Sequence, residues 1–155
     1  MALAQDSPGI GIPPPLVYAA GLGLGLLADR WVAGRWPLGA ISRPLGWTLV
    51  GCSAAMSVPS LILFWRKRTT IRPDRPATAL ATTGPYRLTR NPMYLSLALL
   101  YAGIAILWQS ICALLLLPLV LFFIDRRVIV REELYLERQF GSAYRQYRAR
   151  VRRWL

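Results

Sequence analysis

Long apolar stretches separated by shorter polar ones run through most of the chain. Residues 44–65 and 104–124 contain no Asp, Glu, Lys, Arg or His, and an α-helix needs about 20 apolar residues to cross a bilayer. Two more apolar segments cover residues 12–29 and 93–108; the first is rich in glycine, which permits close helix packing in a membrane. The pattern predicts an all-α polytopic membrane protein with about four transmembrane helices, at residues 12–29, 44–65, 93–108 and 111–124.

The apolar stretch 93–124 is too long for one span. Its strongest polar break is Gln109-Ser110, so we expect a helical hairpin whose two ends lie on the same side of the membrane. After Asp125 the sequence becomes amphipathic and charged, which predicts helices over residues 125–155, the first of them ending at Gly141. A chain of 155 residues is long enough for a single membrane domain, residues 1–155, and too short for two ordinary domains.

The net charge of +12 is distributed unevenly, and its distribution predicts an orientation. With four spans, the loop 66–92 and the helices 125–155 share one side, and all 19 Lys and Arg residues except Arg30, Arg35 and Arg43 fall there. Cytoplasmic loops are enriched in Lys and Arg, so this side and both termini are predicted to be cytoplasmic. The Arg-, Leu- and Ala-rich composition is typical of a high-GC bacterium, which points to a bacterial inner membrane.

The same rule accounts for the basic clusters 66–68 and 148–153, which flank apolar segments. It explains the charge more simply than a nucleic-acid partner, which we do not expect. Histidine is absent, so the usual base at neutral pH is missing. Cys52 and Cys112 lack the spacing of a metal site or a redox pair. We predict no metal and interpret both cysteines as small buried side chains.

Two polar segments carry candidate chemistry. The first, residues 83–94, places Arg87 and Arg90 between Gly-Pro and Asn-Pro turns, just before a membrane helix. Such a turn can direct guanidinium groups, and the free amides of a helix that begins at Pro92, toward one anion. A basic loop at the membrane surface, with its tyrosines among the head groups, would show the same pattern.

The second segment, residues 131–141, contains three of the seven acidic residues, among them Glu132 and Glu133. It continues into Tyr144 and Tyr147. An amphipathic helix that lies along the head groups, with its glutamates paired to arginines, would also explain this composition.

Taken together, the two segments resemble a known family. Gly84-Pro85-Tyr86-Arg87-x-x-Arg90-Asn91-Pro92-x-Tyr94 is similar to the signature of the isoprenylcysteine carboxyl methyltransferase and phospholipid methyltransferase group. Glu132-Glu133-x-x-Leu136-x-x-x-Phe140-Gly141-x-x-Tyr144-x-x-Tyr147-x-x-x-Val151 is similar to its C-terminal signature, and an apolar hairpin between the two is the family arrangement. The resemblance covers roughly residues 78–155. Many members carry histidine at the place of Asn91, which cannot act as a titratable base.

The resemblance implies an integral membrane methyltransferase that uses S-adenosylmethionine and releases S-adenosylhomocysteine. It implies a lipophilic methyl acceptor, carboxylate or phospholipid-like, at the cytoplasmic membrane edge. The implied catalytic residues are Arg90, Glu132 and Glu133. The implied cofactor-binding residues are Tyr86, Arg87, Asn91, Pro92, Tyr94, Leu95, Tyr144 and Tyr147. The lipid bilayer and the acceptor are the expected partners.

In this interpretation the turn before the hairpin holds the cofactor carboxylate, and one of the two glutamates faces its ammonium or sulfonium group. Two alternatives remain. Membrane sterol-type reductases use NADPH and have a related Arg-x-Pro-x-Tyr turn, but usually a different C-terminal signature. A non-catalytic lipid-binding membrane protein could also keep this fold. The identity of the acceptor, the separate roles of the two glutamates and the oligomeric state stay open.

Overall fold

A computed structural model describes residues 11–32, 39–66 and 80–155. All regular secondary structure in these residues is helical, which confirms the predicted all-α fold. The elements are α1 (Pro14–Ala28), the 3-10 helix η1 (Gly39–Ile41), α2 (Ser42–Arg66), the 3-10 helix η2 (Gly84–Arg87), α3 (Pro92–Leu107), α4 (Ile111–Ile124), the π-helical η3 (Asp125–Ile129), α5 (Val130–Phe140) and α6 (Ser142–Arg150).

The four predicted apolar segments coincide with α1, α2, α3 and α4, with ends that differ by a few residues. In the part of the chain that the structure describes, Gly39–Arg66 has the length and apolar character of a membrane-crossing helix. Pro14–Ala28 and Pro92–Leu107 are apolar helices of shorter length. Most of the predicted loop 66–92 lies outside the described residues; its described part contains η2.

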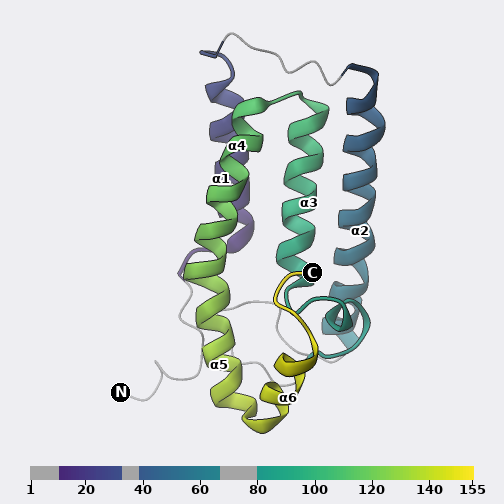
Figure 1. Ribbon diagram of the computed structural model, residues 1–155, viewed down its shortest axis with the longest axis vertical. Helices are drawn as coiled ribbons and strands as arrows, with labels where there is room; N and C mark the ends of the chain where they lie inside the picture. Colours follow the sequence, from purple (N-terminus) through teal and green to yellow (C-terminus); the bar gives the residue numbers. More distant parts are fainter. Residues whose placement is uncertain (1–10, 33–38, 67–79) are drawn as a thin grey trace.

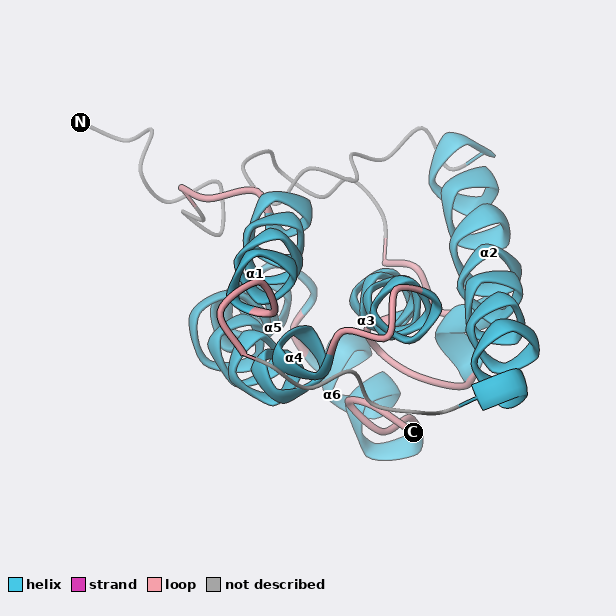
Figure 2. Ribbon diagram, turned by 90° about the horizontal axis from the view of Figure 1, so that it is seen from above, coloured by secondary structure: helices cyan, strands magenta, loops and turns pink. Residues whose placement is uncertain are grey.

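The four long helices run side by side, and α5 and α6 lie beyond one end of this bundle (Figure 1). Seen from above, α3 lies between α2 and α4, and α1 lies beside α4 (Figure 2). The most extensive helix pairings are α2 with α3 and α1 with α4. The predicted hairpin is present: α3 and α4 are joined at Gln109, which has a positive φ of 53°, and Ser110 caps α4 by accepting a hydrogen bond from the Ala113 amide.

Small residues allow the paired helices to approach closely. A side chain at Gly25 of α1 would collide with the backbone of Ala113 on α4. A Cβ atom on Gly103 of α3 would lie 2.9 Å from the Gly46 carbonyl oxygen of α2. The Ser53 hydroxyl donates to the Ser96 carbonyl across the same α2–α3 seam, at 2.7 Å. Small and weakly polar residues therefore form the helix seams, as in membrane proteins.

Large apolar side chains lie on the outer faces of the bundle instead. Exposed examples include Leu24 on α1, Trp47 and Ile62 on α2, and Leu115 on α4. Cys52 also lies on the exposed face of α2, so its interpretation as a buried side chain is wrong. An apolar outer surface around a seam of small residues suits a lipid environment and not water.

The chain leaves the bundle through a continuous helical rod. After Ile124 of α4, the π-helical turn η3 leads directly into α5. Gly141, with a φ of 53°, ends α5, as the sequence predicts, and α6 turns back beside it. The final residues return to the start of α3, where the Arg90 amide donates to the Arg152 carbonyl at 2.9 Å (Figure 1).

Candidate functional site

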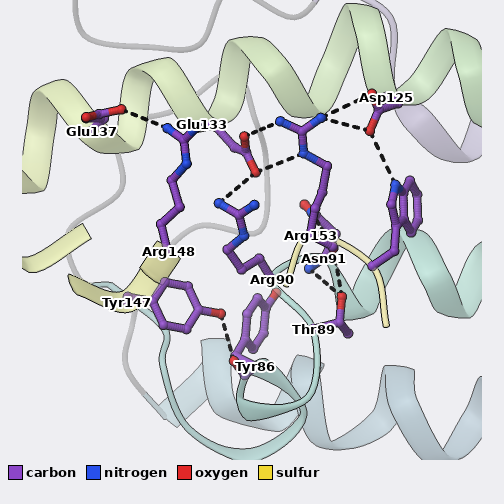
Figure 3. Close-up of polar contacts among 11 residues, drawn as sticks. Tyr86, Thr89, Arg90, Asn91, Asp125, Glu133, Glu137, Tyr147, Arg148 and Arg153 are labelled. Carbon is purple, nitrogen blue, oxygen red and sulfur yellow. Dashed lines mark hydrogen bonds and ion pairs between the residues drawn. The ribbon is translucent and has the colours of Figure 1, made fainter. Parts of the chain in front are cut away.

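The turn before α3 forms one side of a polar cluster at this end of the bundle (Figure 3). Gly84 has a positive φ of 63° and allows the chain to enter η2. Thr89 is fully buried; its hydroxyl donates to the Arg153 carbonyl at 2.9 Å and accepts from the Asn91 amide at 3.2 Å. The turn is therefore fixed both by its own backbone and by the C-terminal segment before Pro92 begins α3.

Arg90 extends from this turn into the protein. Only 10% of its side chain is exposed, and its Nη1 lies 3.1 Å from Oε1 of Glu133 on α5. Figure 3 shows the Glu133 carboxylate between the guanidinium groups of Arg90 and Arg153. The Nε atom of Arg90 is buried and has no hydrogen-bond partner among the described residues. A buried guanidinium donor without an acceptor is costly, so this atom marks a place where an anion would be stabilised.

Glu132, the preceding residue on α5, has different surroundings. Its Oε2 accepts a hydrogen bond of 2.8 Å from the Tyr94 hydroxyl of α3. Within the described residues it forms no ion pair with Arg or Lys, whereas Glu133 pairs with two arginines. Burial raises the pKa of Glu132; the Tyr94 hydrogen bond opposes this rise and the neighbouring Glu133 charge adds to it. Glu132 is thus a partly buried carboxylate that a ligand cation would stabilise.

Aromatic residues join α6 to the turn. The Tyr147 hydroxyl donates to the Tyr86 carbonyl at 2.7 Å, and the Tyr86 ring meets Phe64 of α2 edge-on, with centroids 5.7 Å apart. Tyr144 is almost completely buried in the same cluster. Burial raises the pKa of Tyr144 to about 12; the Glu133 charge adds to this rise, and the Arg90 guanidinium opposes it. These rings hold η2 and α6 together beside Arg90.

Comparison with known proteins identifies the family. The family model described as phospholipid methyltransferase matches residues 42–143, about two thirds of the chain. The protein belongs to the phospholipid methyltransferase family. The match runs from the start of α2 through the turn, the hairpin and α5, and it assigns the chain to a group of membrane methyltransferases.

An uncharacterized protein of Haemophilus influenzae is 41% identical over 69 residues, which are 41% of this chain and 100% of that relative. No solved structure matches the chain.

The structure brings most residues of the two family signatures together. Arg90 contacts Glu133, Tyr94 contacts Glu132 and Tyr86 contacts Tyr147. The side-chain amide of Asn91 donates to the Arg153 carbonyl at 3.0 Å, so in this structure it holds the backbone.

The remaining predicted residues take no part in the ion pairs seen among the described residues. Arg87 is exposed and makes no ion pair within the described part of the chain, so it does not join Arg90. Pro92 is buried as the first residue of α3, and Leu95 is half-buried one turn later. Tyr144 and Tyr147 are covered by protein, so their present role is packing. A ligand contact for these residues stays a prediction.

Sequence reasoning missed Arg153 and Asp125. The prediction that membrane topology alone explains the basic cluster 148–153 is wrong for Arg153, whose guanidinium bonds to Asp125 and Glu133. Arg148 also pairs, with Glu137, but at an exposed position. One signal was present in the sequence: Asp125 follows directly on an apolar helix, where a carboxylate needs a cationic partner. Which arginine supplies it depends on the path of the chain after α6.

Proposed function

We propose that the protein is an integral membrane, S-adenosylmethionine-dependent methyltransferase that transfers a methyl group to a lipophilic acceptor at the cytoplasmic membrane edge. The observation that carries this proposal is a pair of charged side chains that the protein compensates incompletely: the nearly buried Arg90 of the turn and the partly buried Glu132 of α5. Arg90 has a buried donor without an acceptor, and Glu132 has a hydrogen bond but no cation within the described residues. The family match supports the reaction class.

The chemistry of the two groups fits the cofactor. The amino-acid end of S-adenosylmethionine is zwitterionic, so its carboxylate suits the guanidinium of Arg90 and its ammonium or sulfonium suits Glu132. Glu133 is less suited to the cation because Arg90 and Arg153 already neutralise it. When bound, the cofactor supplies the activated methyl group. Since methyl transfer is an in-line displacement, the main task of the protein is to hold cofactor and acceptor in line.

The acceptor determines whether a base is needed. A carboxylate acceptor is already nucleophilic, whereas an amine must lose a proton. The chain has no histidine, and within the described part of the site Glu132, hydrogen-bonded to Tyr94, is a carboxylate not engaged by a cation. Burial raises the pKa of Glu132, which makes it a stronger base than an exposed glutamate. We therefore assign to Glu132 both cation binding and, for an amine acceptor, proton acceptance.

We also propose that α1 to α4 all cross the bilayer, although α1 with its 15 residues spans only about 22 Å. Apolar outer faces and local thinning of the bilayer make such short helices compatible with a membrane. All Lys and Arg residues except Arg30, Arg35 and Arg43 then lie at the end that carries the polar cluster. The positive-inside rule places this end and both termini in the cytoplasm, with the protein in a bacterial inner membrane.

Variants of the two charged groups test the proposed site by calorimetric titration of S-adenosylhomocysteine into purified protein in lipid nanodiscs. Arg90→Met is expected to abolish measurable binding, and Glu132→Gln to weaken it at least about tenfold, since each removes a charge-assisted contact. The matched controls are exposed Arg145→Met on α6 and Glu137→Gln on α5, which should bind like the unmodified protein. Equal affinity of Arg90→Met and Arg145→Met would refute the assignment.

A further inference from the structure

The segment Val151–Leu155, called the return segment below, contacts both sides of the polar cluster (Figure 3). It lies outside residues 42–143, which match the family. Its backbone contacts the turn before α3, and two of its side chains contact η3 and α5. The two sides of the site are therefore connected through these few residues.

The backbone contacts hold three consecutive residues of the turn. The Arg152 carbonyl accepts the Arg90 amide at 2.9 Å. The Arg153 carbonyl accepts two hydrogen bonds, from the Thr89 hydroxyl at 2.9 Å and from the Asn91 side-chain amide at 3.0 Å. Because Thr89 and Asn91 are buried, breaking these bonds would leave polar groups without partners.

The side-chain contacts reach two carboxylates. Arg153 makes a two-pronged contact with Glu133, Nη2 to Oε2 at 2.6 Å and Nε to Oε1 at 3.2 Å. Its Nη1 lies 3.2 and 3.3 Å from the two carboxylate oxygens of Asp125. The indole of Trp154 donates to Asp125 at 3.3 Å. The hydrogen bond to Glu133 contributes most to raising the pKa of Arg153, so the guanidinium stays charged.

The π-helical turn makes this bridge possible. Successive residues of an α-helix are rotated by about 100°, so Asp125 and Glu133 would differ in direction by roughly 80° on a regular helix. A π turn is wider and rotates each residue less. With η3 spanning Asp125–Ile129, both carboxylates face the same guanidinium.

We propose that Arg153 is a positioning residue that keeps Arg90 available for an anionic ligand group; this inference rests on the proposed function. Both oxygens of Glu133 accept hydrogen bonds from Arg153. Arg90 approaches Glu133 as an ion pair, with Nη1 and Oε1 3.1 Å apart, and its buried Nε and Nη1 atoms have no hydrogen-bond partner among the described residues. Without Arg153, the Glu133 carboxylate would be free to turn both oxygens onto Arg90, in the fork-to-fork geometry that arginine and carboxylate favour. The N–H donors of the Arg90 guanidinium would then be bonded to Glu133 and no longer available to a ligand.

The test compares Arg153→Met with Arg152→Met, an exposed neighbour that serves as the matched control. Hydrogen exchange of the Arg90 and Asn91 amides reports on the turn, and titration with S-adenosylhomocysteine reports on the site. For Arg153→Met we expect faster exchange and an affinity at least about tenfold weaker. Arg152→Met should match the unmodified protein in both measurements. Arg153→Lys, which keeps the charge but not the fork, should fall between them.

A double variant separates positioning from general stability. If Glu133 captures Arg90 when Arg153 is absent, then Glu133→Gln in the Arg153→Met background should restore part of the lost affinity. Additive loss in the double variant would overturn the proposal, and so would an affinity of Arg153→Met equal to that of Arg152→Met. If Arg153→Met does not fold, Arg153→Lys with and without Glu133→Gln provides the same comparison. Absence of binding by the unmodified protein would refute the proposed function, while amide exchange would still test the contact of Arg153 with the turn.

Discussion

At the scale of single residues, the site depends on a difference between two neighbours on α5. Glu133 is neutralised by two arginines, and Glu132 is bonded only to the Tyr94 hydroxyl among the polar contacts of the described residues. The sequence presents them as an undivided Glu-Glu pair. These separate surroundings support the proposal that Glu132 binds the ligand cation, while Glu133 pairs with Arg90.

This difference predicts an unusual pH dependence of stability. Burial raises the pKa of Glu132 above its ordinary value of about 4.3. The contribution of this group to the free energy of unfolding is therefore complete below about pH 4.3 and is lost as the pH rises through the raised pKa. In Glu132→Gln the free energy of unfolding should no longer fall as the pH rises through this range, whereas in Glu137→Gln the fall should persist. Thermal unfolding in nanodiscs between about pH 4 and pH 8 measures both; parallel curves for the protein and Glu132→Gln would contradict the assignment.

The sequence could predict that arginine and glutamate belong to the site, but not which of several arginines or glutamates lies in it. Arg87 and Arg90 are equivalent in the sequence signature, yet one is exposed and the other is 90% buried against Glu133. The turn between them is not a regular helix or strand, so no periodicity fixes their directions. The role of Arg153 could not be predicted for a related reason: its partners Glu133 and Asp125 lie 20 and 28 residues earlier in the chain, so no local pattern connects them.

At the scale of elements, helix pairing depends on a few small residues. Gly25 of α1 and Gly103 of α3 each lie where a Cβ atom would meet the backbone of the neighbouring helix. Gly23 and Gly51 lie on open faces with nothing within 4 Å of an added Cβ. Glycines of the bundle, even Gly23 and Gly25 of the same helix, therefore have different roles, which the sequence does not distinguish.

Replacing Gly25 by alanine should destabilise the protein by about 1–3 kcal/mol, because the α1 and α4 backbones must move apart. Gly23→Ala in the same helix should change the free energy of unfolding by less than about 1 kcal/mol, in the stabilising direction, since alanine favours the helix. Denaturation of both variants in the same detergent measures the difference. Equal stability of the two variants would show that α1 does not pack on α4 in this way.

The elements themselves were largely predictable, because apolar segments and turn residues are local signals. The hairpin at Gln109-Ser110 and the end of α5 at Gly141 both appear where the sequence places them. The π turn η3 was not predictable. It brings Asp125 and Glu133 to one guanidinium supplied by a distant segment, and a local pattern carries no information about that partner.

At the scale of the whole molecule, polar and apolar side chains are separated both along the bundle axis and between its interior and its outer surface. Small residues line the seams and large apolar side chains face outward, while the carboxylates and arginines of the site gather at one end (Figures 1 and 3). A bilayer suits the apolar outer surface. Under the proposed function, the polar cofactor and the lipophilic acceptor meet at the edge of that bilayer.

The proposed orientation predicts how two ends of the bundle react with a membrane-impermeant maleimide. In a background with Cys52 and Cys112 replaced by serine, Trp31→Cys after α1 should be labelled in intact spheroplasts. Arg145→Cys on α6 should be labelled only after the membrane is permeabilised. Both side chains are exposed in the structure, so access depends on sidedness. The opposite labelling pattern would show that the protein has the reverse orientation in the membrane.

The most direct test of the central claim is calorimetric titration of the unmodified protein in nanodiscs with S-adenosylhomocysteine at neutral pH. The proposed function predicts saturable binding, with an affinity that falls as the pH is lowered, because a ligand cation requires ionised Glu132. NADPH should neither compete with this binding nor protect the protein from thermal unfolding. Absence of saturable binding, together with protection by NADPH, would contradict the methyltransferase assignment of the site.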